Sequence, residues 1–196
     1  GMLVILLVLQ KDLGSALIFY MTYLTMLYIA TSNEILLFSG MGVLAVGSVF
    51  AYKLFSHVRV RVAAWKNPWV DIDSGGSQLC QPLFAIGTGG LLGSGLTRGM
   101  PVSIPVVSKD FIFAAICEEF GTIYAICLIG VFILLFTRGI MIAFKCRRRY
   151  YSFIAAGFTV MMAFQTFLIM GGVIKLIPLT GVTLPFISYG GTSIFG

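Results

Sequence analysis

The chain has 196 residues, of which 59% are hydrophobic and only 10% are charged. Its mean hydropathy is +1.02. This composition excludes a soluble domain and predicts an all-α polytopic membrane protein, because only helices or closed barrels can cross a bilayer. The net charge of +6 argues against nucleic acid as a partner for so apolar a chain and favours membrane lipid or a lipid-linked phosphate.

Four apolar segments are long enough to be membrane spans: residues 15–30, 35–55, 110–136 and 152–176. Residues 1–9 resemble the end of a span and residues 192–196 the start of another, so we expect a fragment of a longer protein. The sequence therefore predicts one integral membrane domain with about four full transmembrane helices and partial ones at both ends. In the turn before the second span, either Ser32 or Asn33 could cap the next helix.

Two loop regions carry most of the glycine and proline outside the spans. Residues 56–109 form a long loop, and residues 177–191 form a turn rich in Pro and Gly. Within them, Phe84–Leu96 and Pro178–Ser193 are apolar but broken by glycine, which makes both candidate re-entrant segments. Irregular backbone at membrane depth must be covered by protein or line a watery cavity. The two segments therefore predict a roofed cavity on one side of the membrane.

The basic residues orient the spans. The short loop 138–151 contains Arg138, Lys145, Arg147, Arg148 and Arg149, so the positive-inside rule predicts that it is cytoplasmic. Counting spans from it places residues 56–109 and 177–191 outside the cell. A second basic cluster, Lys53, Arg59, Arg61 and Lys66, then also lies outside, against the trend. Binding an anionic group there would explain it.

A lone carboxylate, Asp110, stands where the long loop enters the 110–136 span. Ionisable groups at the edge of the hydrocarbon are costly and usually functional, although an Asp at this point could simply cap the helix. On a continuous helix Glu118 would lie roughly 12 Å further along the axis and Glu119 on nearly the opposite face. We expect those two residues to make structural bonds with loop amides or a basic side chain. Cys117 and Gly121 share the face of Asp110, which predicts a shallow groove for a lipid tail.

Four motifs occur in a characteristic order: QKDLGSA, QPLFAIGTGGLLGSGL, KDFIFAAICEEFG and PLTGVTLPFISYGGTS. They resemble the SEDS family (shape, elongation, division and sporulation proteins such as RodA, FtsW and SpoVE). The resemblance covers nearly the whole chain and corresponds to the later half of the family's membrane helices. Mild departures from the family pattern occur at Lys11, Pro82 and Thr88.

The resemblance implies a peptidoglycan glycosyltransferase that polymerises lipid II at the outer face of the cytoplasmic membrane. It implies a class B penicillin-binding protein as partner, for cell shape, division or sporulation. The family's essential acid falls in its DFIFA motif, which makes Asp110 the catalytic candidate. We expect no certain cofactor; a divalent cation such as Mg or Mn that bridges diphosphate remains an open alternative, and the residues alone predict no metal site.

The implied chemistry needs few groups. A diphosphate leaving group needs cations rather than an acid, and the acceptor hydroxyl needs a base. The candidates for binding diphosphate or sugar are Arg59, Arg61, Lys66, Gln78, Arg98, Lys109, Ser188 and Tyr189. Those expected to support the site are Lys11, Asp12, Glu118, Glu119, Gly121, Pro185, Gly190 and Gly191.

Two other functions fit parts of the pattern. A lipid II flippase would carry functional charges at the membrane midplane with access from both sides. The ionisable groups of this chain gather instead on the outer side, which favours chemistry there. A non-catalytic scaffold would be indicated if Asp110 were replaced. As a half-chain, the fragment alone is expected to be inactive.

Overall fold

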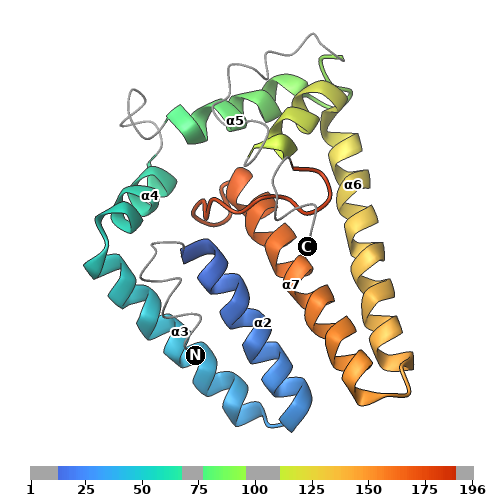
Figure 1. The fold of residues 1–196 in the computed structure, drawn as a ribbon. Helices are drawn as coiled ribbons and strands as arrows, with labels where there is room; N and C mark the ends of the chain where they lie inside the picture. The colour runs from blue at the N-terminus through green and yellow to red at the C-terminus, as the bar shows by residue number, and fades with distance from the viewer. Residues whose placement is uncertain (1–12, 68–76, 96–110, 189–196) are drawn as a thin grey trace. The chain divides into compact units, whose positions relative to one another are not determined.

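The computed structural model describes residues 13–67, 77–95 and 111–188, and these residues form helices and connecting segments without a strand (Figure 1). Four helices are long and apolar enough to cross a membrane: α2 (Leu13–Thr31), α3 (Glu34–Leu54), α6 (Ile112–Lys145) and α7 (Arg149–Val173). Two shorter helices are α4 (Ser56–Lys66) and α5 (Ser77–Gly89). The predicted all-α, multi-pass architecture is confirmed. The partial spans predicted at 1–9 and 192–196 lie outside the described residues.

The chain divides into two compact units. The hairpin unit comprises Gly1–Arg59 and Ile133–Phe164, and the loop unit comprises Val60–Phe132 and Gln165–Gly196. Among the described residues, the hairpin unit contains α2, α3 and the adjoining ends of α6 and α7. The loop unit contains α5, most of α4, the first part of α6, the last turns of α7 and the segment that follows α7.

In the hairpin unit, α2 and α3 run antiparallel and pack closely (Figure 1). The Tyr20 hydroxyl donates a 2.8 Å hydrogen bond to the carbonyl of Gly40, and the absence of a side chain at Gly40 makes room for Leu24. At the turn, the Asn33 side chain accepts a 3.0 Å bond from the amide of Ile35 and caps α3. Ser32 instead takes a left-handed conformation, with φ 51°. Of the two predicted caps, Asn33 is therefore the one that forms.

The second hairpin of this unit joins α6 to α7 through residues 146–148. Gly139 of α6 lies directly against Thr159 of α7, and the Ser152 hydroxyl donates a 2.7 Å bond to the carbonyl of Ala143. The basic region predicted as a loop over 138–151 is thus mostly helical. The apolar run Ile140–Phe144 has no proline to stop the helix, so α6 continues to Lys145.

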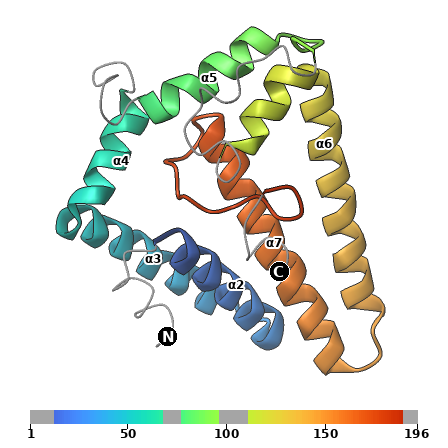
Figure 2. The ribbon, with the colours of Figure 1, turned by 45° about the horizontal axis from the view of Figure 1, so that its top comes forward.

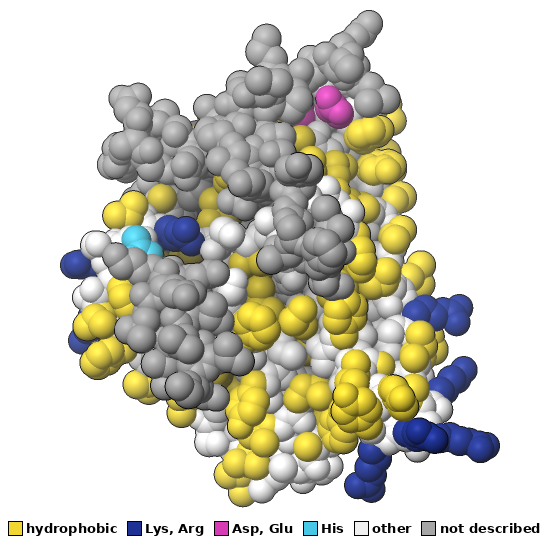
Figure 3. All heavy atoms as spheres, in the orientation of Figure 1, with side chains coloured by type: hydrophobic (Ala, Val, Ile, Leu, Met, Phe, Trp, Pro, Cys, Tyr) yellow, Lys and Arg dark blue, Asp and Glu magenta, His cyan; other side chains and the backbone are white. Residues whose placement is uncertain are grey.

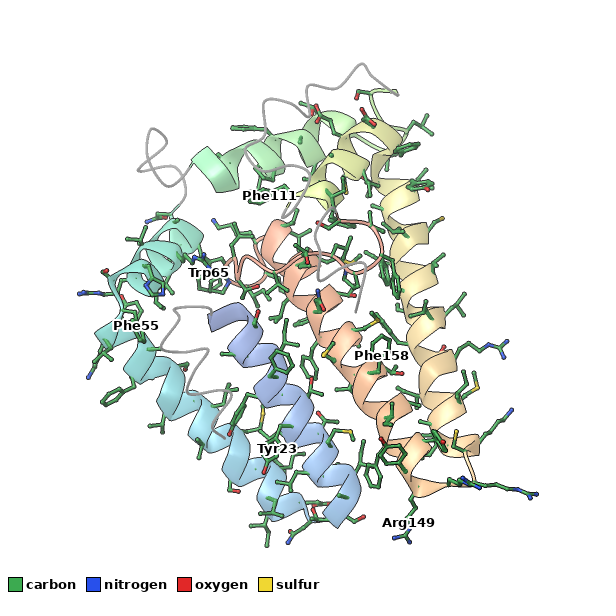
Figure 4. The ribbon with its side chains drawn as sticks, viewed as in Figure 1. Tyr23, Phe55, Trp65, Phe111, Arg149 and Phe158 are labelled. Atoms are coloured by element: carbon green, nitrogen blue, oxygen red, sulfur yellow. The ribbon has the colours of Figure 1, made fainter. Side chains whose placement is uncertain are left out.

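The long helices are apolar on the sides that no other described residue covers. α3 has no buried residue, and Ile35 and Phe38 are 76% and 71% exposed. Hydrophobic side chains cover much of the face in Figure 3, and the dark blue Lys and Arg side chains stand out at its lower right. Arg149, at the start of α7, points away from the helices in Figure 4. Apolar sides of this kind suit lipid, and basic helix ends suit the headgroup region.

In the loop unit, α4 and α5 occupy part of what the sequence predicts as a loop, residues 56–109. Ser56–Lys66 contains no Gly or Pro, so nothing in it interrupts a helix. α5 contains Pro82, which is almost completely buried. α5 ends at the glycines of the GTGGLLGSG motif, and the following residues to Gly95 pack against α6. The helical path of α5 and the bend in α6 are both seen in Figure 2.

Candidate functional site

The first part of α6 is a short, buried piece of helix. The carbonyl of Phe111 accepts bonds from the amides of Ala114 and Ala115, at 3.0 and 3.2 Å, so Phe111 occupies the N-cap position. Phe111, Phe113 and Ala114 are 4%, 3% and 0% exposed. Figure 4 places Phe111 where this piece begins. Asp110, the next residue towards the N-terminus, lies outside the described residues.

α6 is not continuous, because it breaks at Gly121. The backbone there has φ 85° and ψ 172°, a conformation that is nearly restricted to glycine. The prediction of an unbroken span from 110 to 136 is therefore wrong at this point. The predicted groove for a lipid tail is also wrong, because the backbone of Leu91, Leu92 and Gly93 fills the space beside Gly121.

The break is closed by a second segment, and we call residues 89–95 and 118–123 together the glycine clasp. The carbonyls of Glu118 and Glu119 accept bonds from the amides of Ser94 (2.9 Å) and Gly95 (3.1 Å). The amides of Thr122 and Ile123 donate to the carbonyls of Gly90 (3.0 Å) and Leu91 (3.4 Å). The polar backbone groups that the break exposes are thus paired within the protein, which apolar surroundings require.

Two hydroxyls reinforce the glycine clasp. The Ser94 hydroxyl donates a 2.9 Å bond to the carbonyl of Glu118, and the Thr122 hydroxyl donates a 2.7 Å bond to the carbonyl of Gly90. The two segments lie so close that a Cβ atom at Gly89, Gly93 or Gly121 would collide with backbone atoms of the other segment. Gly93, with φ 82°, and Gly121 also have conformations that other residues rarely adopt.

The end of α7 forms a second ordered feature. The amide of Leu176 bonds to the carbonyl of Gly171 at 2.7 Å and that of Lys175 to Gly172 at 3.2 Å, which is the pattern of a Schellman cap. The left-handed position of that cap, normally glycine, is Lys175 with φ 62°. The indole of Trp65 donates a 3.0 Å bond to the carbonyl of Lys175. A side chain of α4 thereby holds a strained turn in place.

A second side chain of α4, Arg61, bonds to the residues that follow this turn. Nη1 of Arg61 donates to the carbonyls of Leu179 (3.3 Å) and Thr180 (3.1 Å). Arg61 and Trp65 are one helical turn apart and so share a side of α4. Residues two positions apart on a helix differ by about 200°, so Arg59 points away from Arg61. α4 alone therefore does not bring the guanidinium groups of Arg59 and Arg61 to one phosphate.

The segment from Pro178 to Ser188 is tied to α7 as well. Nε2 of Gln165 donates a 2.7 Å bond to the carbonyl of Thr183, so this polar residue of a span bonds a loop rather than another helix. Leu184 and Pro185 are almost completely buried, and Ser188 is 5% exposed. Phe186 is 59% exposed and has φ 67°. The segment from Pro178 to Ser188 is therefore a packed turn in which the Phe186 side chain is exposed.

Many of the predicted site residues fall outside the described part of the chain: Asp110, Arg98, Lys109, Tyr189, Gly190, Gly191, Lys11 and Asp12. Gln78 lies in the first turn of α5, and its side chain is outside the description. Lys66 and Arg59 are exposed on α4. The main-chain carbonyls of Glu118 and Glu119 accept bonds from loop amides, and the bonds expected of their carboxylate side chains stay a prediction. In the described ranges, no group of three or more His, Cys, Asp and Glu residues could hold a metal ion.

Trp65, Ser94, Thr122 and Lys175 are structural residues of this region that the sequence did not single out. A partial signal was present for the glycine clasp, since Gly121 interrupts an apolar span two residues after the second of two glutamates and directly before a threonine. The four residues themselves carry no local signal, because each bonds a residue at least 24 positions away.

These features define a class of protein: an all-α, multi-pass membrane protein in which one span is broken and capped by a glycine-rich segment. The family model that matches is described as "Cell cycle protein" and groups FtsW, RodA and SpoVE; it covers residues 1–195. The chain therefore belongs to the SEDS family, and the predicted membership is confirmed.

The relatives carry names that span the family. The chain is 40% identical over 187 residues to a protein named peptidoglycan glycosyltransferase RodA from Mycobacterium tuberculosis, covering 95% of this chain and 40% of that protein. It is 38% identical to stage V sporulation protein E of Bacillus subtilis, covering 94% of this chain and 51% of that protein. The chain thus spans about half the length, or less, of these relatives.

A solved structure is also similar. The chain resembles one chain of a peptidoglycan synthase complex, whose study concerns the coordination of polymerization and crosslinking. The TM-score is 0.77 at 28% identity, over 98% of this chain and 54% of that one.

Proposed function

We propose that the protein is a peptidoglycan glycosyltransferase that polymerises lipid II at the outer face of the cytoplasmic membrane, with Asp110 as the general base. The observation that carries the proposal is the KDFIFAAICEEFG motif in a chain of this family. Its acid directly precedes a helix start whose residues Phe111, Phe113 and Ala114 are at most 4% exposed. The name peptidoglycan glycosyltransferase borne by several relatives supports it.

The proposed reaction needs one carboxylate as the base and several cations to stabilise the leaving group. Asp110 takes the proton of the acceptor sugar hydroxyl as its oxygen forms a bond to the anomeric carbon of the donor. The bond from that carbon to the diphosphate oxygen breaks, and the diphosphate leaves as an anion. Cations offset its developing charge, and Lys66, Arg98, Lys109 and Arg59 are the candidates. No step depends on a metal, and a divalent cation that accompanies the diphosphate is compatible with this scheme.

Two of the predicted contacts take other roles in this proposal. Arg61 bonds to the Leu179 and Thr180 carbonyls, so we assign it to shaping the loop. Ser188 is 5% exposed and is assigned to the same task, while Gln78 and Tyr189 remain candidates for sugar contacts.

We further propose a class B penicillin-binding protein as partner, because polymerised glycan must be crosslinked. The similarity to a chain of a peptidoglycan synthase complex supports an assembly of this kind. The complex also sets the conditions for the test, since the protein should be assayed in its full-length form with its partner.

The test measures polymer formed from labelled lipid II by Asp110→Asn. Loss of the base should lower the polymerisation rate by at least about 100-fold. Glu34→Gln is the matched control: it neutralises an exposed carboxylate in the first turn of α3 and should leave the rate unchanged. Normal glycan from Asp110→Asn would contradict the proposal. If Asp110→Asn instead blocked transfer of labelled lipid II across vesicle membranes while polymerisation continued, a flippase would be the better assignment.

A further inference from the structure

We infer that the tip of the glycine clasp, Leu91 and Leu92, inserts among the acyl chains of the bilayer, together with the exposed side of α5. The partner of this surface is the hydrocarbon of the membrane rather than water or another protein. The inference does not depend on the proposed catalytic function, because it concerns only where the clasp lies in the membrane. All the residues that carry it belong to the loop unit.

The two leucines at the tip are exposed although their backbone is firmly held. Leu91 is 70% and Leu92 is 85% exposed. The carbonyl of Leu91 accepts a 3.4 Å bond from the amide of Ile123, and the amide of Gly93 donates a 2.8 Å bond to the carbonyl of Gly89. Turns that face water usually carry polar side chains. Two adjacent leucines on a fixed turn suit apolar surroundings instead.

The exposed side of α5 is apolar as well. Pro82, Ala85 and Gly89 lie on the buried side of this helix, whereas Phe84 and Thr88, one turn apart, are exposed. The Thr88 hydroxyl donates to the carbonyls of Phe84 (3.0 Å) and Ala85 (3.1 Å). A hydroxyl that bonds its own helix leaves no polar group for water to satisfy, so it can face lipid. Figures 1 and 2 both show the other side of α5 against the first part of α6.

The tip is level with the apolar surface of a membrane-spanning helix. The sequence from Phe84 to Leu96 contains no charged residue. On α6, just past the break, Ile123 and Ile126 are 52% and 63% exposed. Because the carbonyl of Leu91 bonds to the amide of Ile123, the tip lies at the same height along α6 as these side chains. The surface that α6 offers to lipid therefore extends to the level of the tip.

An aromatic pair indicates the depth of the tip. Phe120 and Tyr124, on either side of Gly121, stack with their ring centroids 4.8 Å apart, and both are partly exposed. Tyrosine rings on membrane proteins gather where hydrocarbon meets the headgroups. The tip should thus enter the hydrocarbon near its edge. Irregular backbone at that depth needs internal partners, and the carbonyl of Gly90 has two, the amide and the hydroxyl of Thr122.

The experiment adds one tryptophan to the full-length protein in phosphatidylcholine vesicles, made with or without brominated acyl chains. Leu92→Trp places this reporter at an exposed position, so it should leave the thermal unfolding temperature unchanged. Leu134→Trp is the lipid reference, since Leu134 is an exposed side chain of α6. Arg148→Trp, in the turn between α6 and α7, is the water reference. The added emission is the difference from the unsubstituted protein.

Brominated lipid should quench the added emission of Leu92→Trp at least about half as strongly as that of Leu134→Trp. Aqueous iodide should quench Arg148→Trp far more strongly than Leu92→Trp. If iodide quenches Leu92→Trp strongly and brominated lipid does not, the tip lies in water and the inference is overturned. Weak quenching by both also overturns it, because protein then covers the tip. Leu91→Trp gives the same comparison if Leu92→Trp does not fold.

Discussion

The hairpin unit and the loop unit pair their backbone amides and carbonyls in different ways. In the hairpin unit, the described helices satisfy their own backbone and meet through small residues, as Gly40 meets Leu24 and Gly139 meets Thr159. In the loop unit, α6 opens at Gly121 and its backbone groups are satisfied by residues 90–95. Since an unpaired amide or carbonyl is very costly away from water, an interruption of this kind needs a second segment built to fit it. The loop unit therefore contains both the break in α6 and the segment that closes it.

α6 shows the contrast within one element. Before the break, Phe113 and Ala114 are 3% and 0% exposed, whereas near the boundary of the hairpin unit Val131 and Leu134 are 58% and 65% exposed. The first piece is thus enclosed by protein, and the later part presents apolar side chains outward, as a lipid-facing span does. The effect of a Gly→Ala substitution should accordingly depend on whether its site is enclosed by protein or faces outward.

The largest expected effect is at the break itself. Gly121→Ala adds a Cβ atom that would meet backbone atoms of Leu91 and Gly93, at a backbone conformation nearly restricted to glycine. We expect a loss of about 3 kcal/mol or more in stability, measured by thermal unfolding in detergent micelles. Gly130→Ala, in the same helix with open space around the new atom, should not destabilise the protein. Equal stability of the two variants would show that the break is not a fixed feature.

A smaller effect is expected at the end of α7. Trp65→Phe removes the bond to the carbonyl of Lys175 and should cost about 1 kcal/mol of stability. Because Lys175 is left-handed, adding Lys175→Gly to this variant should recover about 0.5–1 kcal/mol by relieving the strained conformation. Thermal unfolding of the single and double variants measures both. A further loss in the double variant would contradict the assignment of strain to Lys175.

The smallest effect, of opposite sign, is expected in the hairpin unit. A Cβ atom at Gly47 of α3 would meet nothing within 4 Å, so Gly47→Ala should stabilise the helix by about 0.5 kcal/mol. Gly40→Ala on the same helix should instead destabilise, since its Cβ would press into Leu24. Comparing the unfolding temperatures of the two variants tests whether α3 touches α2 through one side only. Destabilisation by both would mean that a neighbour also covers the side of Gly47.

Much of the fold could be predicted from the sequence, because burial in lipid leaves a strong compositional signal. The four apolar runs predicted the spans, and Asn33 was one of two predicted caps. The sequence predicted loops where α4 and most of the 138–151 region are helical, because basic residues among apolar ones lower hydropathy without breaking a helix. Asp110 stood out by its position and by the family motif around it, whereas the choice of phosphate-binding cations rested on charge alone.

The amino-acid sequence by itself determined that the chain crosses a membrane several times and which family it belongs to, since both depend on local composition and ordered motifs. Only the tertiary structure decided that α6 is broken at Gly121, and that Arg61 and Trp65 bond to a distant turn. The physical reason is the same in each case. These arrangements depend on hydrogen bonds between segments 24 or more residues apart, and such pairings leave no periodic pattern in the chain.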